Sequence, residues 1–316
     1  MGYCSVQALV DKAQAVEELG YSAFYASDHL HGVAGAPPNA PFLEPWTLLA
    51  AIAAKTEKLR LGCLVAGVTY RHPAILAKLA ATVDAISGGR LEVGLGAGWS
   101  SADHVAYGLP FPPLRERLER LEETLQILDG IWTRQPFSFD GAHYRFRDAP
   151  FSPPPVQKPR PPFLLAGASP RLLRLTARWA DHWVSLSTPD FARSCIERIG
   201  RECRALGRDP AEIEHGLSIG LLLSSDPAEV ERALRERALP APAGAERAQG
   251  RTALEGESGE ERARASLLAG SPEQVRERIG RYLEAGVTHF ILLTPPPFDP
   301  GLLERFRDQV IRTLPA

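Results

Sequence analysis

The pair Asp28-His29, in the segment SDHL, is the first candidate for chemistry in this sequence. It directly follows an apolar stretch at 22–26 that predicts a β-strand, so both side chains would stand at the end of that strand. A histidine titrates near neutral pH and can give or take a proton. We therefore expect His29 to be a catalytic proton partner and Asp28 to orient its ring. The alternative is a structural pair that caps the following loop.

His29 and His31 also form an H-x-H pair, which on a barrel strand can ligate a catalytic zinc ion. Such a site needs further histidines at the carboxyl ends of later strands and an aspartate near the last strand. His182 and His289 instead fall near the start or middle of their predicted strands, and Asp299 follows a run of prolines. The zinc site is therefore the weaker alternative, and we expect no metal.

Small residues end two other predicted strands and form candidate phosphate-binding loops. These loops are Gly96-Ala97-Gly98-Trp99 and Ala166-Gly167-Ala168-Ser169. Small side chains let backbone N–H groups face a phosphate, and a helix N-terminus favours negative charge. Pro170 suits the first turn of a helix after the second loop, which makes that loop the stronger candidate. The alternative is ordinary strand-to-helix turn chemistry.

Strand and helix signals alternate along the whole chain. In the block 71–99, apolar residues at helical spacing follow Pro73, Gly88-Gly89 ends the helix, and an apolar strand follows at 91–95. Further strands are expected at 22–26, 59–65, 163–166, 182–186, 213–223 and 288–293, with helices at 5–19, 46–56, 114–132, 170–179, 190–206, 227–237, 271–285 and 301–313. This order predicts an α/β fold, a TIM-type (β/α)8 barrel forming a single domain over 1–316, with ligands at the carboxyl ends of its strands.

Three segments depart from this alternation. The segment 134–160 contains FSFDGAHYRF, which predicts a hairpin, and a proline-rich return. The segment 238–265 lacks aromatic, Ile and Val residues, so we expect a mobile loop, either a tolerated insertion or a lid. At the start, only four residues precede the first helix signal at Ser5. We therefore expect the first barrel strand to be missing or truncated.

Composition excludes several classes of protein. The net charge is −2 and the basic residues are spread along the chain, so nothing indicates a nucleic-acid partner. No apolar run reaches the ~20 residues that cross a bilayer, and no signal peptide is evident. The four cysteines form no CxxC pair, which favours reduced thiols in a cytoplasmic protein. A small-molecule substrate and a homodimer remain as the expected partners.

The quoted motifs resemble the luciferase-like monooxygenase superfamily, and most of all its branch that uses the deazaflavin coenzyme F420. The segments that carry this resemblance are GYSAFYASDHL at 20–30, LGCLVAGVTY at 61–70, the block 71–99, PFPPLRERLERLEETLQILDGIWT at 110–133 and PPFLLAGASPRLLRLTARWADHWVS at 161–185. The resemblance implies hydride transfer between C5 of the coenzyme and a small organic substrate, with His29 beside the redox-active ring. It also implies that the 134–160 insertion covers the barrel mouth.

The resemblance assigns further residues. Leu64, Val65 and Ala66 match a bulge that backs the coenzyme ring, with a cis peptide between Leu64 and Val65. Trp99 stands where a sugar-phosphate-oxidising relative has an acidic proton donor, so we expect a different substrate, with Trp99 lining the site. Arg71 matches a family position and is interpreted as a structural partner. The alternatives on the same fold are an FMN-dependent monooxygenase and a non-catalytic flavin-binding paralogue.

Overall fold

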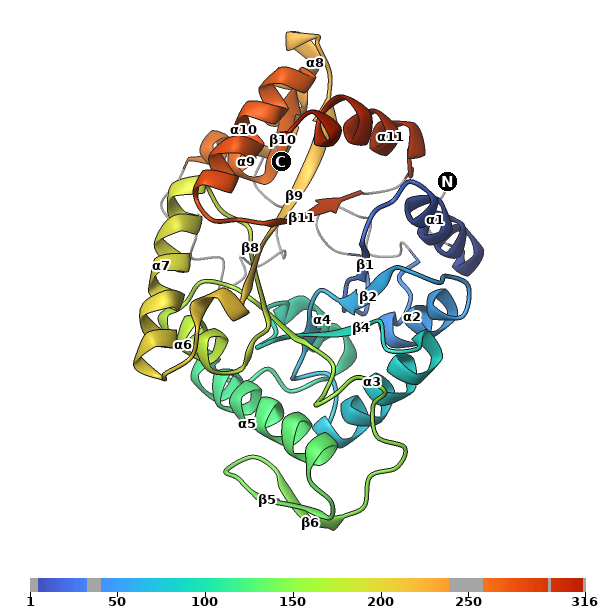
Figure 1. The fold of residues 1–316 in the computed structure, drawn as a ribbon, viewed down its shortest axis with the longest axis vertical. Coiled ribbons are helices and arrows are strands. Elements are labelled where there is room, and N and C mark those ends of the chain that lie inside the picture. Colours follow the sequence, from blue (N-terminus) through green and yellow to red (C-terminus); the bar gives the residue numbers. More distant parts are fainter. Residues whose placement is uncertain (1–4, 33–40, 239–257, 295–296, 315–316) are drawn as a thin grey trace. The chain divides into compact units, whose positions relative to one another are not determined.

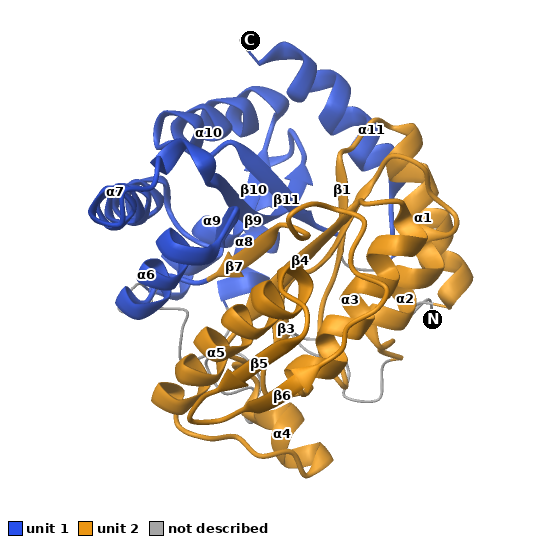
Figure 2. Cartoon of the chain, turned by 60° about the horizontal axis from the view of Figure 1, so that its bottom comes forward, with its two compact units in different colours: residues 1–2, 167–243, 250–316 blue, residues 3–166, 244–249 orange. Residues whose placement is uncertain are grey.

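The computed structural model describes residues 5–32, 41–238, 258–294 and 297–314. Its described residues form two compact units that meet in sequence at Ala166 and Gly167 (Figure 2). We call them the amino-terminal unit and the carboxy-terminal unit, and describe each by itself. No described helix is both long enough and apolar enough to span a bilayer.

The amino-terminal unit is built on parallel strands. Strand β1 pairs with β2, β2 with β4, and β4 with both β3 and β7. Helices α1, α2, α3 and α5 lie around the outside of these strands (Figure 1). The elements are α1 (Val6–Glu18), β1 (Ala23–Ala26), α2 (Pro45–Ala53), β2 (Arg60–Cys63), β3 (Ala66–Gly67), α3 (Pro73–Ser87), β4 (Leu91–Gly96), α4 (Ser101–Tyr107), α5 (Leu114–Thr133), β5 (Phe137–Asp140), β6 (Arg145–Ala149) and β7 (Phe163–Ala166). Every residue of β4 is buried, as expected for a strand covered on both faces.

The carboxy-terminal unit repeats the same pattern. The long strand β9 pairs in parallel with β8, β10 and β11 along different parts of its length. Its elements are α6 (Pro170–Trp179), β8 (His182–Ser185), α7 (Pro189–Ala205), a 3-10 turn (Pro210–Glu212), β9 (Glu214–Leu223), α8 (Pro227–Ala238), α9 (Gly259–Ser266), β10 (Leu267–Gly270), α10 (Pro272–Glu284), β11 (His289–Leu293), α11 (Pro300–Gln309) and a second 3-10 turn (Ile311–Thr313). Its main core joins β9 and β10 to α10 and α11 through Leu217, Leu268, Ile279 and Phe306.

The insertion forms the predicted hairpin, which two carboxylates hold in place. Strands β5 and β6 pair antiparallel. At the tip of the hairpin, Glu123 of α5 accepts hydrogen bonds from the backbone N–H groups of residues 142, 143 and 144. Beyond the hairpin, the fully buried Asp84 of α3 accepts from the N–H of Val156 at 2.7 Å and from both the N–H and the side-chain amide of Gln157. The segment is therefore tied to two helices of its own unit.

The alternation of strands and helices read from the sequence is confirmed, with ends that differ by a few residues. Helix α1 begins at Val6, and the Ser5 side chain caps it by accepting the N–H of Ala8. The expectation of a missing first strand concerns residues 1–4, which lie outside the described residues. The single domain over 1–316 stays a prediction.

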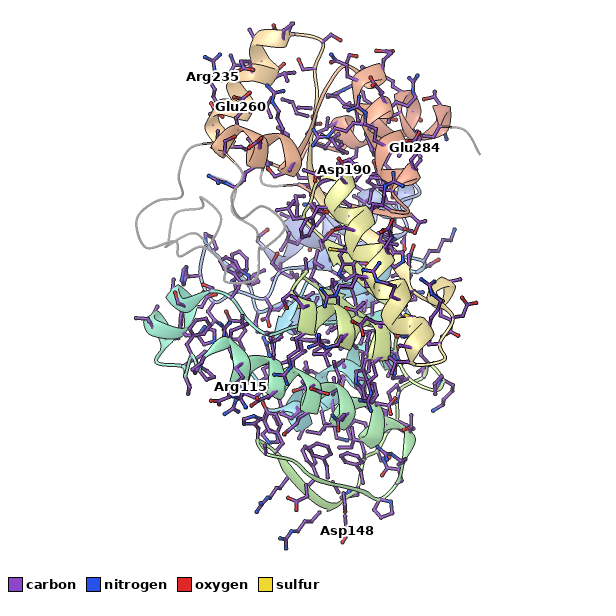
Figure 3. The ribbon with its side chains drawn as sticks, turned by 90° about the vertical axis from the view of Figure 1, so that its left-hand side faces the viewer. Arg115, Asp148, Asp190, Arg235, Glu260 and Glu284 are labelled. Carbon is purple, nitrogen blue, oxygen red and sulfur yellow. The ribbon has the colours of Figure 1, made fainter. Side chains whose placement is uncertain are left out.

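The segment 238–265 is partly ordered, which corrects the expected loop. Residues 239–257 lie outside the described residues, but helix α9 begins at Gly259. Ser258 and Glu261 form a reciprocal capping box at its start. Ala263 of α9 packs with Leu234 of α8 and Leu267 of β10, so the helix buries apolar surface through small residues. Figure 3 labels Arg235 on α8 and Glu260 on α9.

Candidate active site

Asp28, just beyond β1, is held by Arg71. The guanidinium donates to both carboxylate oxygens, at 2.7 and 2.9 Å, and the N–H of Gly67 donates to one of them at 3.1 Å. Arg71 also donates to Glu44, which caps α2. Burial lowers the pKa of Arg71, but the bonds and charges of Asp28 and then Glu44 outweigh it and raise the pKa above its usual value. The prediction that Asp28 orients His29 is therefore wrong, and the structural role expected for Arg71 fits these contacts.

His29 is oriented instead by Asp103, in the first turn of α4. Its Nδ1 lies 2.7 Å from Asp103 Oδ2, and the Tyr70 hydroxyl donates to the same oxygen at 2.8 Å. Burial raises the pKa of Asp103, but the bonds from His29 and Tyr70 and the His29 charge outweigh this and lower the pKa to about 2. Burial and the bond to Asp103 raise the pKa of Tyr70. Asp103 is thus ionised at neutral pH, and one of its carboxylate oxygens accepts two hydrogen bonds.

The other ring nitrogen of His29 is available for chemistry. Because an ionised carboxylate only accepts, Nδ1 must carry a hydrogen, and in the neutral ring the lone pair is then on Nε2. Nε2 has no hydrogen-bond partner within the described part of the chain. The Trp99 ring meets the imidazole edge-on, with centroids 5.0 Å apart, and Phe42 lies at 6.1 Å. The side chain is 10% exposed. This is an Asp–His pair with an accessible base between aromatic walls.

The peptide between Leu64 and Val65 is cis, as predicted. The residues on either side of this peptide pack against two glycines of β4. A Cβ on Gly94 would collide with the Cys63 carbonyl oxygen, and one on Gly96 would lie 2.7 Å from the Val65 side chain. The chain beyond Cys63 therefore fits against β4 only where β4 has no side chains.

The loop after β4 is shaped mainly by packing. Gly98 has a φ of +78°, and a Cβ there would lie 2.7 Å from Thr69 Oγ1. Its carbonyl accepts a hydrogen bond from Arg117, which is buried. The Gly96 carbonyl accepts from the N–H of Val68 at 3.1 Å. The small residues of this loop thus have a structural explanation.

The second predicted loop, Ala166-Gly167-Ala168-Ser169, joins β7 to α6. Both backbone groups of Gly167 are engaged: its N–H donates to the Val184 carbonyl, and its carbonyl accepts from the Trp183 indole. Ser169 caps α6 by accepting the N–H of Leu172. The N–H groups of Ala168 and Ser169 make no hydrogen bond to any described residue. They remain the candidate hydrogen-bond donors to an anion in this loop. The Gly167 N–H is not one of them.

Sequence reasoning missed Asp103 and Tyr70. A local signal was present, because Ser100 and Asp103 have the S-x-x-D spacing of a capped helix start. The structure confirms this cap, with the Asp103 N–H donating to Ser100 Oγ at 3.2 Å. The alternative of a zinc site at the H-x-H pair gains no support from the structure. No group of three or more His, Cys, Asp or Glu residues in the described ranges is arranged to hold a metal ion. His29 and His31 both face Asp103.

A model of the luciferase-like monooxygenase family matches residues 3–289, so the chain belongs to this family. It is 26% identical, over 97% of this chain and 93% of the other, to an F420-dependent glucose-6-phosphate dehydrogenase of Microbacterium testaceum. It is 30% identical, over 70% of this chain and 56% of the other, to an FMNH(2)-dependent dimethylsulfone monooxygenase of Pseudomonas putida.

Among solved structures, an F420-dependent secondary alcohol dehydrogenase with an F420-acetone adduct superposes with a TM-score of 0.81 at 21% identity. The match covers 99% of this chain and 96% of that chain. The predicted family is confirmed, and so is the predicted fold class, that of the luciferase-like TIM-type barrels.

Proposed function

We propose that this protein is an oxidoreductase that uses coenzyme F420 and a small organic substrate. The relatives named for F420 support both the oxidoreductase class and the cofactor. The observation that carries the proposal is the arrangement of His29: Asp103 holds Nδ1, Nε2 has no hydrogen-bond partner among the described residues, and the Trp99 ring packs against the imidazole. An alcohol whose carbon gives up a hydride also releases its hydroxyl proton, and a histidine nitrogen in this position would accept it.

The residues of this chain supply the proton chemistry. When bound, the deazaflavin supplies a carbon that accepts or gives a hydride. His29 Nε2 takes the proton that an alcohol group releases as its carbon is oxidised, and returns it in the reverse direction. Asp103 keeps the ring in the tautomer with Nδ1–H and stabilises the imidazolium that forms. Tyr70 holds the same oxygen of Asp103 and limits its rotation.

Each unit contributes its own set of proposed coenzyme contacts. In the amino-terminal unit, Leu64, Val65, Ala66, Gly96, Gly98 and Trp99 are the residues that we propose to line its ring. A fused aromatic ring suits the apolar walls that Trp99 and Phe42 form around His29. In the carboxy-terminal unit, we propose that the N–H groups of Ala168 and Ser169, at the start of α6, donate hydrogen bonds to a phosphate of the coenzyme.

An FMN-dependent monooxygenase is the second candidate, because the 30% identical relative is FMNH(2)-dependent. Titration of the purified protein with F420 and with FMN, followed by fluorescence quenching or heat, separates the two. We expect tighter binding of F420. Tighter binding of FMN would reverse the cofactor assignment, and binding of both without turnover of any alcohol or carbonyl would favour a flavin-binding paralogue.

We also propose a cytoplasmic location and a homodimer. The thiols of Cys63, Cys195 and Cys203 are free and buried, which fits a reducing compartment. Light scattering on the purified protein tests the dimer, and a mass of 34.4 kDa would contradict it.

A further inference from the structure

One side chain joins the two ends of the segment 99–111, which contains α4 and Asp103 and which we call the α4 segment. Arg117 of α5 donates from Nε to the Pro112 carbonyl at 2.9 Å, and its guanidinium also donates to the Gly98 carbonyl. Gly98 directly precedes the α4 segment and Pro112 directly follows it. Arg117 therefore closes the base of the segment that carries Asp103.

The burial of Arg117 gives these contacts their weight. The residue is 1% exposed, and no carboxylate in the described part of the chain forms an ion pair with it. Burying a cation without a counter-charge is costly unless its donors find acceptors. The two carbonyls are such acceptors, and the guanidinium also lies over the Phe111 ring, 4.1 Å from its centroid. All three contacts belong to the α4 segment or to the two residues that flank it.

Three packed rings lead from Arg117 to Asp103. The Phe111 ring packs on His104 with centroids 4.5 Å apart, and His104 stacks on Tyr70 at 4.9 Å with an interplanar angle of 23°. At the far end, the Tyr70 hydroxyl donates to Asp103 Oδ2 at 2.8 Å. We call these three rings the ring column. It connects the buried cation to the carboxylate of the proposed site.

His104 fixes the column to the rest of the amino-terminal unit. It is fully buried, its Nδ1 donates to the Ser100 carbonyl at 2.6 Å, and its Nε2 lies 2.8 Å from Thr69 Oγ1. The ring cannot turn without breaking both contacts. Because His104 and Asp103 are consecutive residues of α4, a shift of α4 that removed His104 from the column would also displace Asp103.

We propose that Arg117 is a positioning residue, which closes the α4 segment and supports the ring column so that the Asp103 carboxylate stays bonded to His29. The catalytic part of this proposal rests on the proposed function, whereas the placement of Asp103 does not. Lysine cannot take over this role, because a single ammonium group lacks the planar fork that donates to two carbonyls and lies flat on a ring. Losing one charge-assisted hydrogen bond should make local opening at least about tenfold more frequent.

The direct test is NMR of the His29 Nδ1–H in the whole protein, labelled with ¹⁵N-histidine and free of coenzyme. We expect this N–H, assigned by its absence from His29→Asn, to exchange slowly with water in the unchanged protein. The control Arg115→Lys, at an exposed arginine of the same helix, should exchange equally slowly. In Arg117→Lys we expect exchange at least about tenfold faster. Equal rates in Arg117→Lys and Arg115→Lys would overturn the proposal, and so would fast exchange in the unchanged protein.

A second variant isolates the ring column and serves if Arg117→Lys does not fold. Phe111→Leu leaves both carbonyl bonds of Arg117 in place and removes the ring between the guanidinium and His104. We expect the His29 N–H to exchange at least about threefold faster, while the backbone amides of β9 in the other unit keep their rates. An unchanged His29 rate would overturn the role of the ring column. Faster exchange that included β9 equally would indicate general destabilisation and would also contradict the proposal.

Where turnover of an alcohol with F420 is measurable, a double-mutant cycle tests whether Arg117 acts through Asp103. Arg117→Lys should slow hydride transfer roughly tenfold when Asp103 is present, and less than about twofold in an Asp103→Asn background. Losses that simply add would show that Arg117 acts elsewhere and would overturn the proposal.

The two measurements separate this inference from the proposed function. If His29 N–H exchange accelerates in Arg117→Lys while hydride transfer is unchanged, His29 is not the proton partner, and the proposed function fails while the placement of Asp103 by Arg117 stands. If N–H exchange is unchanged in Arg117→Lys and His29→Ala still abolishes turnover, the proposed function stands and this inference fails.

Discussion

Arg71 binds both carboxylate oxygens of Asp28, and Asp28 in turn accepts the backbone N–H of Gly67. The pair thus links the end of β1 to the short strand β3 through one fully buried carboxylate. The position of Asp28 next to His29 in the sequence suggested catalysis, whereas its contacts are structural. We call the Arg71–Asp28 pair the brace.

Replacing Arg71 tests that brace. Arg71→Met leaves the Asp28 carboxylate buried without its cation, which destabilises proteins by about 3–5 kcal/mol. Urea unfolding measures the change. The matched control is Arg115→Met on the surface of α5, labelled in Figure 3, whose side chain is 87% exposed and pairs with Glu119. The control should change stability by less than about 0.5 kcal/mol, and equal losses in the two variants would contradict the brace.

The acid stability of the protein should depend on Asp103. Its pKa falls from a usual 3.8 to about 2 in the folded chain, so the folded state binds its proton less readily than the unfolded state. The resulting stabilisation is present above pH 3.8, reaches roughly 2 kcal/mol, and is lost as the pH falls to about 2. Urea unfolding between pH 5 and pH 2 should therefore be less pH-dependent in Asp103→Asn. The exposed Asp190→Asn is the control, and curves parallel to the unchanged protein in both variants would refute the assignment.

His29→Ala should lower turnover far more than it lowers coenzyme affinity. A proton partner acts mainly in the transition state, where it contributes ~10²–10⁴-fold, whereas a binding contact acts on the ground state as well. Single-turnover hydride transfer and coenzyme titration measure the two effects. His143→Ala, on the hairpin, is the control. An unchanged rate in His29→Ala would make His29 a structural residue.

Glucose-6-phosphate should be a poor substrate despite the name of the matched dehydrogenases. Trp99 stands where the resemblance places an acidic proton donor, and its ring packs against His29. Because that donor is missing, we expect kcat/KM for glucose-6-phosphate to be at least ~10²-fold below that of the matched glucose-6-phosphate dehydrogenase. Steady-state assays with F420 compare the two proteins, and equal values would show that Trp99 does not exclude the sugar phosphate.

Two glycines should respond to alanine in opposite directions. In β4, a Cβ on Gly94 would collide with the Cys63 backbone, so Gly94→Ala should prevent folding or destabilise the protein by several kcal/mol. In α10, Gly280 has no positive φ, and a Cβ added there would meet no atom within 4 Å. Gly280→Ala should therefore stabilise the helix by about 1 kcal/mol. Thermal unfolding of both variants checks this, and similar shifts would contradict the packing described around β4.

The sequence predicted the elements better than the contacts of their side chains. Apolar periodicity located β1 and α3 because each is a local pattern. The partner of His29 is not local, since Asp103 is 74 residues away and its pairing depends on the tertiary fold. Asp28 meets Arg71, while His29 meets Asp103, although the two residues are adjacent in the sequence.

Helix α9 was not predicted from the sequence, for a different reason. The helix buries alanines rather than large apolar residues, so composition indicated a loop. A reciprocal cap and packing against Leu234 order it in the fold. Neither contribution is visible in a count of hydrophobic residues.

The hairpin β5–β6 has a practical consequence for protein engineering. Glu123 fixes its tip and Asp84 fixes the chain that follows it, through hydrogen bonds that involve the side chain of neither Arg145 nor Arg147. Arg145 and Arg147 are exposed on β6. A library that randomises these two positions would vary the outer surface of the insertion on a constant backbone, giving laboratory evolution a site for change that leaves Asp103 and His29 untouched.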